Sequence, residues 1–166
     1  MSAIRSRASE GGDPRGAGVG LRQVRRLPFG AEPGAVRRAR TFLRTAMQAY
    51  GWRPAADQAT ELAADDIVLV AVELVTNACL HGGGPIELRV VRYDGGVRVE
   101  VDDRTEARPE PRDPFAGLRT GGHGLLIVRR LSREWGAVVR PGQGKTVWAD
   151  LAEPGRDTGA APDALR

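Results

Sequence analysis

The sequence predicts a single α/β (α+β) domain built as a two-layer sandwich. Two observations lead to this class. Hydrophobic residues recur at three- and four-residue spacing in two early stretches, as in helices, and later alternate with polar residues, as in strands. A helix pair followed by a sheet with one further helix fits two packed layers. The 166 residues, 41% of them hydrophobic, are enough for one domain with its own core.

The helices and strands can be placed in chain order from these patterns. Residues 21–28 are expected to form a first strand. A helix is expected over residues 35–50, because its apolar residues form one stripe, and Gly51 is suited to end it. A second helix is expected over residues 58–80; its centre is apolar on most sides, so it should lie deep in the fold. The glycines at 82–84 end this helix.

After these glycines the hydrophobic period changes to two. Residues 86–90 and 97–101 alternate between apolar and charged side chains around a turn at 94–96, which predicts a β-hairpin. The rest of the domain is expected to contain a loop rich in Pro, Arg and Asp, a third helix that opens at glycines, and two closing strands. These are the loop over 103–120, the glycine stretch 121–124, the helix over 125–132, and the strands over 135–140 and 146–151.

The ordered domain is expected over residues 21–151. Residues 1–20 are rich in Gly, Ser and Arg and hold few large apolar side chains, so we expect a disordered tail, and residues 152–166 have a similar composition. No apolar run reaches the length of about 18 residues that a membrane span needs, and no secretory signal begins the chain. We therefore expect a cytoplasmic protein that does not contact the membrane.

Cysteine content and charge exclude further classes of function. Cys79 is the only cysteine, which excludes a disulfide framework or a cysteine metal cluster within one chain. The formal net charge is +4, but the basic residues are scattered among 21 acidic ones, and Lys145 is the only lysine. Because a nucleic-acid-binding surface would present a basic stripe, we expect no direct contact with nucleic acid.

One polar ridge stands out on the second predicted helix. Glu73, Asn77 and His81 are each four residues apart and so share one helix face. A magnesium–phosphate group would suit this ridge, since Asn offers a carbonyl oxygen to a hard cation and Glu can act as a base. The alternative is a solvent-facing stripe, with His81 favoured at the helix end by the helix dipole.

Two further features fit a nucleotide site. Asp103 follows a strand, where its carboxylate could accept a hydrogen bond from the exocyclic amine of adenine; the alternative is an aspartate that merely forms a turn. Gly121, Gly122 and Gly124 precede a helix, and a helix start with exposed N–H groups attracts phosphate. Alone, this second feature is weak, because many helices begin after glycine.

Two common motifs are only partly present and are rejected. Residues 142–146 resemble a Walker A loop, but that loop requires glycine where Val139 stands, and the following residues alternate as a strand does. Residues 81–84 resemble the oxyanion segment of esterases, but no Gly-x-Ser-x-Gly sequence occurs anywhere in the chain.

Taken together, four segments in this order resemble the GHKL ATPase superfamily, and most of all its small anti-sigma-factor serine/threonine kinases. ELVTNACLHG resembles the N box, VEVDDRTEARP a degenerate first glycine box, GGHGLLIV the second glycine box, and GKTVWADL the closing strand motif. The resemblance covers residues 21–151. It implies the Bergerat ATP-binding fold, a mixed sheet with helices on one face, with ATP and Mg²⁺ as cofactors.

The resemblance also implies roles for individual residues. Glu73 would be the catalytic base, Asn77 would hold Mg²⁺ between the phosphates, and Asp103 would accept the adenine amine. Thr146 would place a hydroxyl on the adenine side. The other nucleotide-binding positions implied by the motifs are His81, Thr105, Gly122, His123, Gly124, Leu125 and Lys145.

The resemblance leads to two hypotheses about function. The first is an anti-sigma-factor serine/threonine kinase that phosphorylates a STAS-type anti-anti-sigma partner and sequesters a sigma factor; a homodimer would fit this class. The second is a non-catalytic ATP-binding or partner-binding module. Thr105 and Ala107 stand where the wider superfamily has loop glycines, which favours the second hypothesis. A sensor histidine kinase would need a phosphoacceptor histidine upstream of the N box, and none is present.

Overall fold

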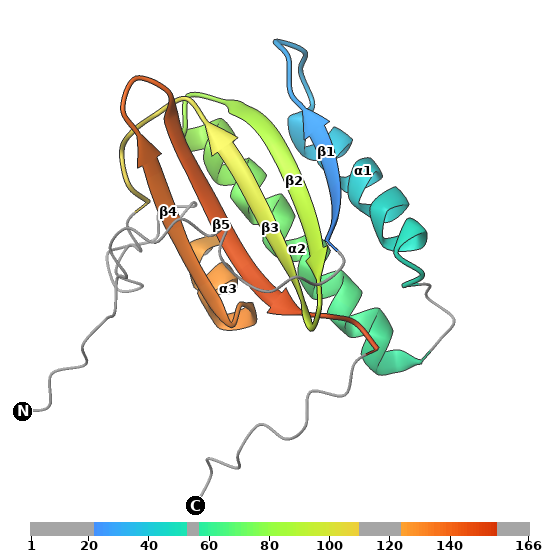
Figure 1. Ribbon diagram of the computed structural model, residues 1–166. Coiled ribbons are helices and arrows are strands. Elements are labelled where there is room, and N and C mark those ends of the chain that lie inside the picture. Colours follow the sequence, from blue (N-terminus) through green and yellow to red (C-terminus); the bar gives the residue numbers. More distant parts are fainter. Residues whose placement is uncertain (1–21, 53–56, 110–123, 156–166) are drawn as a thin grey trace, which may run out of the picture.

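The computed structural model of the protein describes residues 22–52, 57–109 and 124–155 (Figure 1). Within these ranges the chain forms five strands and three helices. Their bounds are β1 Gln23–Pro28, α1 Ala35–Ala49, α2 Gln58–His81, β2 Pro85–Tyr93, β3 Gly96–Asp103, α3 Gly124–Leu131, β4 Glu134–Arg140 and β5 Gly144–Ala152. In Figure 1 the strands form one layer and the helices lie together on one side of it. The predicted two-layer α/β sandwich is therefore confirmed.

The sheet has the strand order β1-β2-β3-β5-β4. All pairings among these strands are antiparallel. This corrects the mixed sheet that the family resemblance implied. Strands β3 and β4 run in the same direction and are joined through α3, but β5 lies between them and pairs antiparallel with both. A parallel contact between β3 and β4 is thereby prevented.

Helix α2 is the central helix of the fold and contacts α1, α3 and the sheet. Its N-cap is Asp57, whose carboxylate accepts hydrogen bonds from the Thr60 backbone N–H at 2.7 Å and the Thr60 hydroxyl at 2.8 Å. These hydrogen bonds lower the pKa of Asp57. The helix buries apolar residues along most of its length, as its composition predicted: Ile67, Val70, Ala71, Val72, Leu74, Val75 and Ala78.

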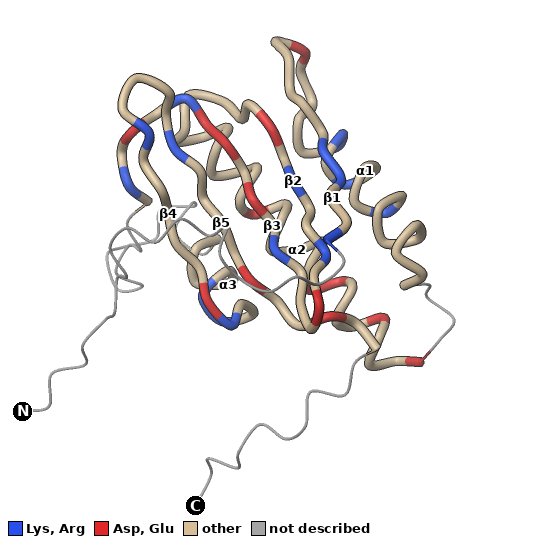
Figure 2. The backbone as a smooth tube through the Cα atoms, viewed as in Figure 1, with Lys and Arg blue, Asp and Glu red and all other residues tan. Residues whose placement is uncertain are grey.

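The two faces of the sheet differ in chemistry because successive side chains of a strand point to opposite sides. Toward the helices the strands bury apolar residues, namely Leu88, Val90, Val97, Val99, Val101, Ala149 and Leu151. The opposite face carries charged residues such as Arg89, Glu100 and Asp102, which are joined in ion pairs. Figure 2 shows basic and acidic segments close together on these strands.

Several predicted boundaries shift in the structure. Strand β5 begins at Gly144 rather than 146, because its pairing with β3 continues as far as Asp103 opposite Lys145. Helix α3 begins at Gly124, and residues 121–123 and the predicted tail over 1–20 lie outside the described residues. The other predicted tail, over 152–166, begins within the described part, because Ala152 is the last residue of β5. In the described ranges, no helix is both long and apolar enough to cross a membrane.

Candidate functional site

The first part of the site is the ridge of α2 that carries Glu73 and Asn77. The two residues are four positions apart, so their side chains lie on one helix face. Gly124, the first residue of α3, packs against both. A Cβ added at Gly124 would lie 2.6 Å from Oε2 of Glu73 and 3.5 Å from both Nδ2 and Oδ1 of Asn77. The absence of a side chain therefore lets the start of α3 reach the ridge.

The amide of Asn77 has unused capacity for hydrogen bonding. Its Nδ2 atom is buried and has no hydrogen-bond partner among the described residues. A buried polar group without a partner costs about 1–3 kcal/mol. The first turn of α3 adds backbone N–H groups that have no partner within the helix, which is an arrangement that favours an anion. The Asn77 amide nitrogen and the N–H groups at the start of α3 thus offer hydrogen-bond donors that a polar, anionic ligand could accept.

The second part of the site is a cluster around Asp103, the last residue of β3. Asp103 and Lys145 are 3% and 5% exposed, and Lys145 Nζ lies 2.9 Å from Asp103 Oδ1. The backbone N–H of Thr105 donates to the same oxygen at 3.0 Å. Lys145 Nζ also donates to Thr105 Oγ1 at 2.8 Å. Three of the predicted binding residues are therefore in contact.

Two glycines bring the end of α2 and the start of β5 close to Asp103. A Cβ at Gly82, directly after α2, would lie 2.6 Å from Oδ2 of Asp103. Gly144 has a φ of +87°, and a Cβ there would lie only 2.0 Å from the carbonyl oxygen of Asp103. The Arg104 backbone N–H donates to the carbonyl of Gly82 at 2.9 Å. The sequence pattern predicts that Gly82 ends the helix, but it does not reveal the close backbone approach that Gly82 and Gly144 each allow.

Through its side chain, His81 makes no hydrogen bond or ion pair with the described residues of either part of the site. It is exposed as the last residue of α2, two turns beyond Glu73, which corresponds to a rise of about 12 Å along the helix. This position fits the alternative interpretation, in which the helix dipole favours a histidine at the end of α2. Its proximity to phosphates stays a prediction.

Comparison with known proteins places this arrangement in a family. The model of the histidine kinase-like ATPase domain matches residues 29–151. The chain belongs to this family. Membership confirms the resemblance to the GHKL superfamily and implies that the domain binds a nucleotide. No curated protein sequence matches the chain.

A solved structure supports the fold of this histidine kinase-like ATPase domain. The chain is similar to the crystal structure of the RsbU and RsbW domains of Rv1364c from Mycobacterium tuberculosis, with a TM-score of 0.55 and 24% sequence identity. The alignment covers 78% of this chain and 32% of that chain. The likeness concerns the fold, since this ATPase domain spans about a third of the matched chain.

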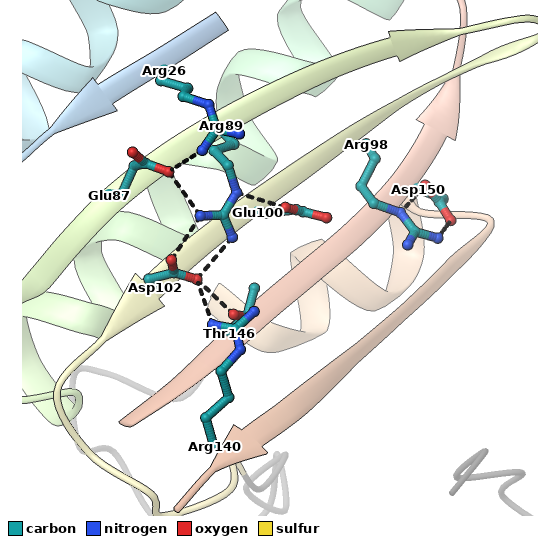
Figure 3. A network of polar contacts seen from close by, with 9 residues as sticks. All are labelled: Arg26, Glu87, Arg89, Arg98, Glu100, Asp102, Arg140, Thr146 and Asp150. Carbon is teal, nitrogen blue, oxygen red and sulfur yellow. Dashed lines mark hydrogen bonds and ion pairs between the residues drawn. The ribbon is translucent and has the colours of Figure 1, made fainter. Parts of the chain in front are cut away.

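In this ATPase domain, Thr146 lies apart from the Asp103 cluster. Its hydroxyl donates to Asp102 Oδ1 at 2.5 Å, on the face of the sheet away from the helices (Figure 3). Asp102 and Asp103 are adjacent on β3 and so point to opposite faces, as Thr146 and Lys145 do on β5. The structure therefore does not bring Thr146 to the side of the sheet where we expected the adenine.

The open face of the sheet carries an ionic network that the sequence did not predict. Arg89 donates to Asp102 at 2.7 and 2.9 Å, to Glu100 at 2.7 Å and to Glu87 at 2.8 Å (Figure 3). Burial alone would lower the pKa of Arg89, but these hydrogen bonds outweigh it and raise the pKa. Alternation of side chains places such residues on one face but does not reveal their partners.

Burial and hydrogen bonding oppose each other at Asp102. Burial alone would raise its pKa, but hydrogen bonds from Arg89 and Thr146 and the charge of Arg89 lower it below the usual value. Asp102 thus remains a carboxylate held by its neighbours. We assign this network to the stability of the sheet, since its side chains are already paired with one another.

The remaining predicted residues are less informative. Gly122 and His123 lie outside the described residues. Leu125 is half-buried in the first turn of α3, next to Gly124. Among the described residues, no group of three or more His, Cys, Asp or Glu side chains could hold a metal ion. The Asn77 amide, whose oxygen is a ligand type that Mg²⁺ accepts, lies beside Gly124, and its role as a magnesium ligand stays a prediction.

Proposed function

We propose that this domain binds Mg-ATP and transfers its terminal phosphoryl group to a serine or threonine of a STAS-type anti-anti-sigma protein, and that it also sequesters a sigma factor. The observation that supports this most is that the start of α3 lies against Glu73 and Asn77. In addition, the amide nitrogen of Asn77 is buried and has no hydrogen-bond partner among the described residues. The anti-sigma subtype is supported by the motif resemblance. A cytoplasmic location and a homodimer belong to the same proposal.

The residues of the ridge have complementary roles in this reaction. The carboxylate of Glu73 takes the proton from the attacking hydroxyl, or orients that hydroxyl toward the phosphorus. Asn77 holds the magnesium ion through its amide oxygen, and that ion supplies charge neutralisation at the phosphates when bound. Gly124 permits the N–H groups of α3 to approach the same phosphates. Most of the catalysis in such a site comes from position and charge.

The base of the nucleotide fits the second part of the site. Asp103 is buried and lies beside Gly82 at the end of α2, so its carboxylate is within the same group of elements as the ridge. A carboxylate accepts hydrogen bonds only, which matches the exocyclic amine of adenine and not the carbonyl of guanine. Asp103 therefore supports ATP as the nucleotide of this domain.

A second candidate is a non-catalytic binding module of the same fold. One observation favours it: Thr105 stands where the superfamily has a loop glycine, and its hydroxyl is engaged by Lys145 at 2.8 Å. This contact ties the segment after β3 to β5 instead of leaving it free to follow a nucleotide. Such a domain would bind its partners without phosphorylating them.

Phosphoryl transfer from labelled ATP to a panel of STAS-domain proteins separates the two candidates. In the kinase, E73Q should bind ATP as the parent does and lose transfer by at least about 100-fold. E61Q is the matched control, because Glu61 is exposed in the first turn of the same helix, and it should transfer normally. Capture of ATP and a STAS protein by the parent without any transfer would support the binding module and refute the kinase.

A further inference from the structure

Lys145 is the only lysine in the chain, and among the residues that the structure describes it is one of the most buried charged side chains. It lies directly opposite Asp103 in the β3–β5 pairing, so the backbone register itself brings the two side chains together. Burying a charged pair is costly unless its geometry is good and its remaining hydrogen-bonding capacity is used. A buried lysine in this position therefore requires an explanation.

The ammonium group of Lys145 has all of its hydrogen-bonding capacity used. It donates to Asp103 Oδ1 at 2.9 Å, to Thr105 Oγ1 at 2.8 Å and to the Thr105 carbonyl at 3.4 Å. A lysine ammonium has three donors, and here three acceptors surround it. Lys145 is thus fixed in one position and does not project toward solvent.

The two oxygens of Asp103 consequently differ. Oδ1 accepts hydrogen bonds from Lys145 and from the Thr105 backbone N–H at 3.0 Å. No hydrogen bond from the described residues reaches Oδ2, which lies on the side of Gly82, where an added Cβ would approach it to 2.6 Å. The protein's own donors therefore occupy one oxygen of the carboxylate and leave the other, Oδ2, without a hydrogen bond from the described residues.

We propose that Lys145 is a positioning residue for base recognition, which engages Oδ1 of Asp103 and presents Oδ2 alone to the nucleotide. This inference rests on the proposed function, in which Asp103 accepts the amine of the base. A single oxygen suits the single exocyclic amine of a 6-aminopurine. Guanine presents two neighbouring donors, a ring N–H and an amine, and pairing with both requires two carboxylate oxygens. Lys145 thereby selects adenine over guanine.

Calorimetry with the full chain tests this role. Three Mg-nucleotides serve as probes: ATP, GTP and purine riboside triphosphate, which has no amine on its base. The parent should prefer ATP over the purine analogue by about 10-fold or more, since a hydrogen bond to a charged group is worth about 1.5–3 kcal/mol. K145M should reduce this preference to less than about 3-fold and leave affinity for the analogue within about 3-fold of the parent.

The control variant is R140M. Arg140 is also a cation near an aspartate, 3.6 Å from Asp102, but it lies in the network of the opposite sheet face. R140M should retain the full preference for ATP. K145M should also narrow the preference for ATP over GTP, because both oxygens of Asp103 then become available. A merely structural role of Lys145 would weaken all three nucleotides alike.

The outcomes separate this inference from the proposed function. A folded K145M that keeps the preference of the parent overturns the role of Lys145 and leaves ATP binding intact. A parent that binds ATP and the purine analogue equally overturns base recognition by Asp103 and this inference with it. A parent that binds none of the nucleotides overturns the proposed function as well. If thermal unfolding shows that K145M does not fold, K145R replaces it.

The arginine variant keeps the charge of Lys145 but cannot place its planar group among the same three acceptors. K145R should therefore prefer ATP over the purine analogue, but by a smaller factor than the parent does. An undiminished preference in K145R would overturn the positioning role.

Discussion

Replacing Gly124 with alanine should separate the stability of this domain from its chemistry. The added Cβ would lie 2.6 Å from Oε2 of Glu73, a separation that real Cβ contacts essentially never show. The atom in its way is the far end of a flexible side chain, so Glu73 should turn aside and α3 should stay in place. Alanine is favoured over glycine by about 1 kcal/mol inside a helix, and less at its first residue. We therefore expect G124A to be about as stable as the parent.

The effect on phosphoryl transfer should be much larger. To restore an ordinary contact of 3.4 Å, the Glu73 oxygen must move by about 0.8 Å. A displacement of about 1 Å at a reacting group costs about 100-fold in rate. G124A should accordingly lose about two orders of magnitude in transfer to a STAS protein, whereas ATP affinity should fall less, because Asp103 and Asn77 keep their positions.

Three measurements check this prediction: urea unfolding, calorimetry with Mg-ATP, and transfer of labelled phosphate. G30A is the matched control, since a Cβ at Gly30 meets nothing within 4 Å, and it should behave as the parent in all three. If G124A transferred phosphate at the rate of the parent, the placement of Glu73 against α3 could not be part of the mechanism.

The remaining predictions concern single residues of the site and of the open-face network. N77A should lose Mg-ATP affinity by at least about 10-fold with little change in stability, because its buried Nδ2 has no partner among the described residues to lose; unchanged affinity in calorimetry would contradict this. D103N should bind ATP more weakly than the parent and should discriminate less against GTP. If the parent bound ATP and GTP equally, Asp103 could not be the residue that recognises adenine. R89M should unfold about 3 kcal/mol more easily in urea, since it removes the cation shared by three part-buried carboxylates, of which only Glu87 and Asp102 keep a second arginine nearby. Because the pKa of Asp102 is lowered in the folded protein, its carboxylate adds stability above the unfolded value of 3.8, and this contribution is lost as the pH falls. D102N should therefore show a smaller loss of stability below about pH 4 than the parent, and equal acid sensitivity would refute the assignment.

Local periodicity predicted the elements well and their partners poorly. The helix expected over 58–80 is observed as Gln58–His81, because a long apolar pattern with a capping aspartate and terminal glycines is specified locally. The antiparallel sheet depends on β5 entering between β3 and β4, which no local pattern encodes. The register between β2 and β3 decides which carboxylates lie next to Arg89. Its ion pairs therefore could not be predicted from the sequence either.

The placement of Thr146 follows a different logic. Lys145 and Thr146 were both expected at the nucleotide, but neighbouring residues of a strand point to opposite faces. Once residues 144–152 are a strand, only one of the two can lie beside Asp103, and the register assigns Lys145 to it. The alternating pattern of this segment therefore predicts that only one of the two residues can reach the nucleotide. The family motif does not show this, because it groups adjacent positions into one binding segment.

The site as a whole depends on backbone approach more than on side-chain contact. Gly124 brings α3 to Glu73, Gly82 brings the end of α2 to Asp103, and Gly144 brings β5 to the same aspartate. At each of these glycines a single methyl group would come within 2.6 Å of a polar atom or closer. The contact at Gly144 is with backbone and cannot be relieved by a side-chain rotation, whereas the one at Gly124 can. Alanine at Gly144 should therefore disrupt the fold itself, whereas alanine at Gly124 should disrupt only the reaction. Comparing the two variants tests which close backbone approach the fold requires and which one only the reaction requires.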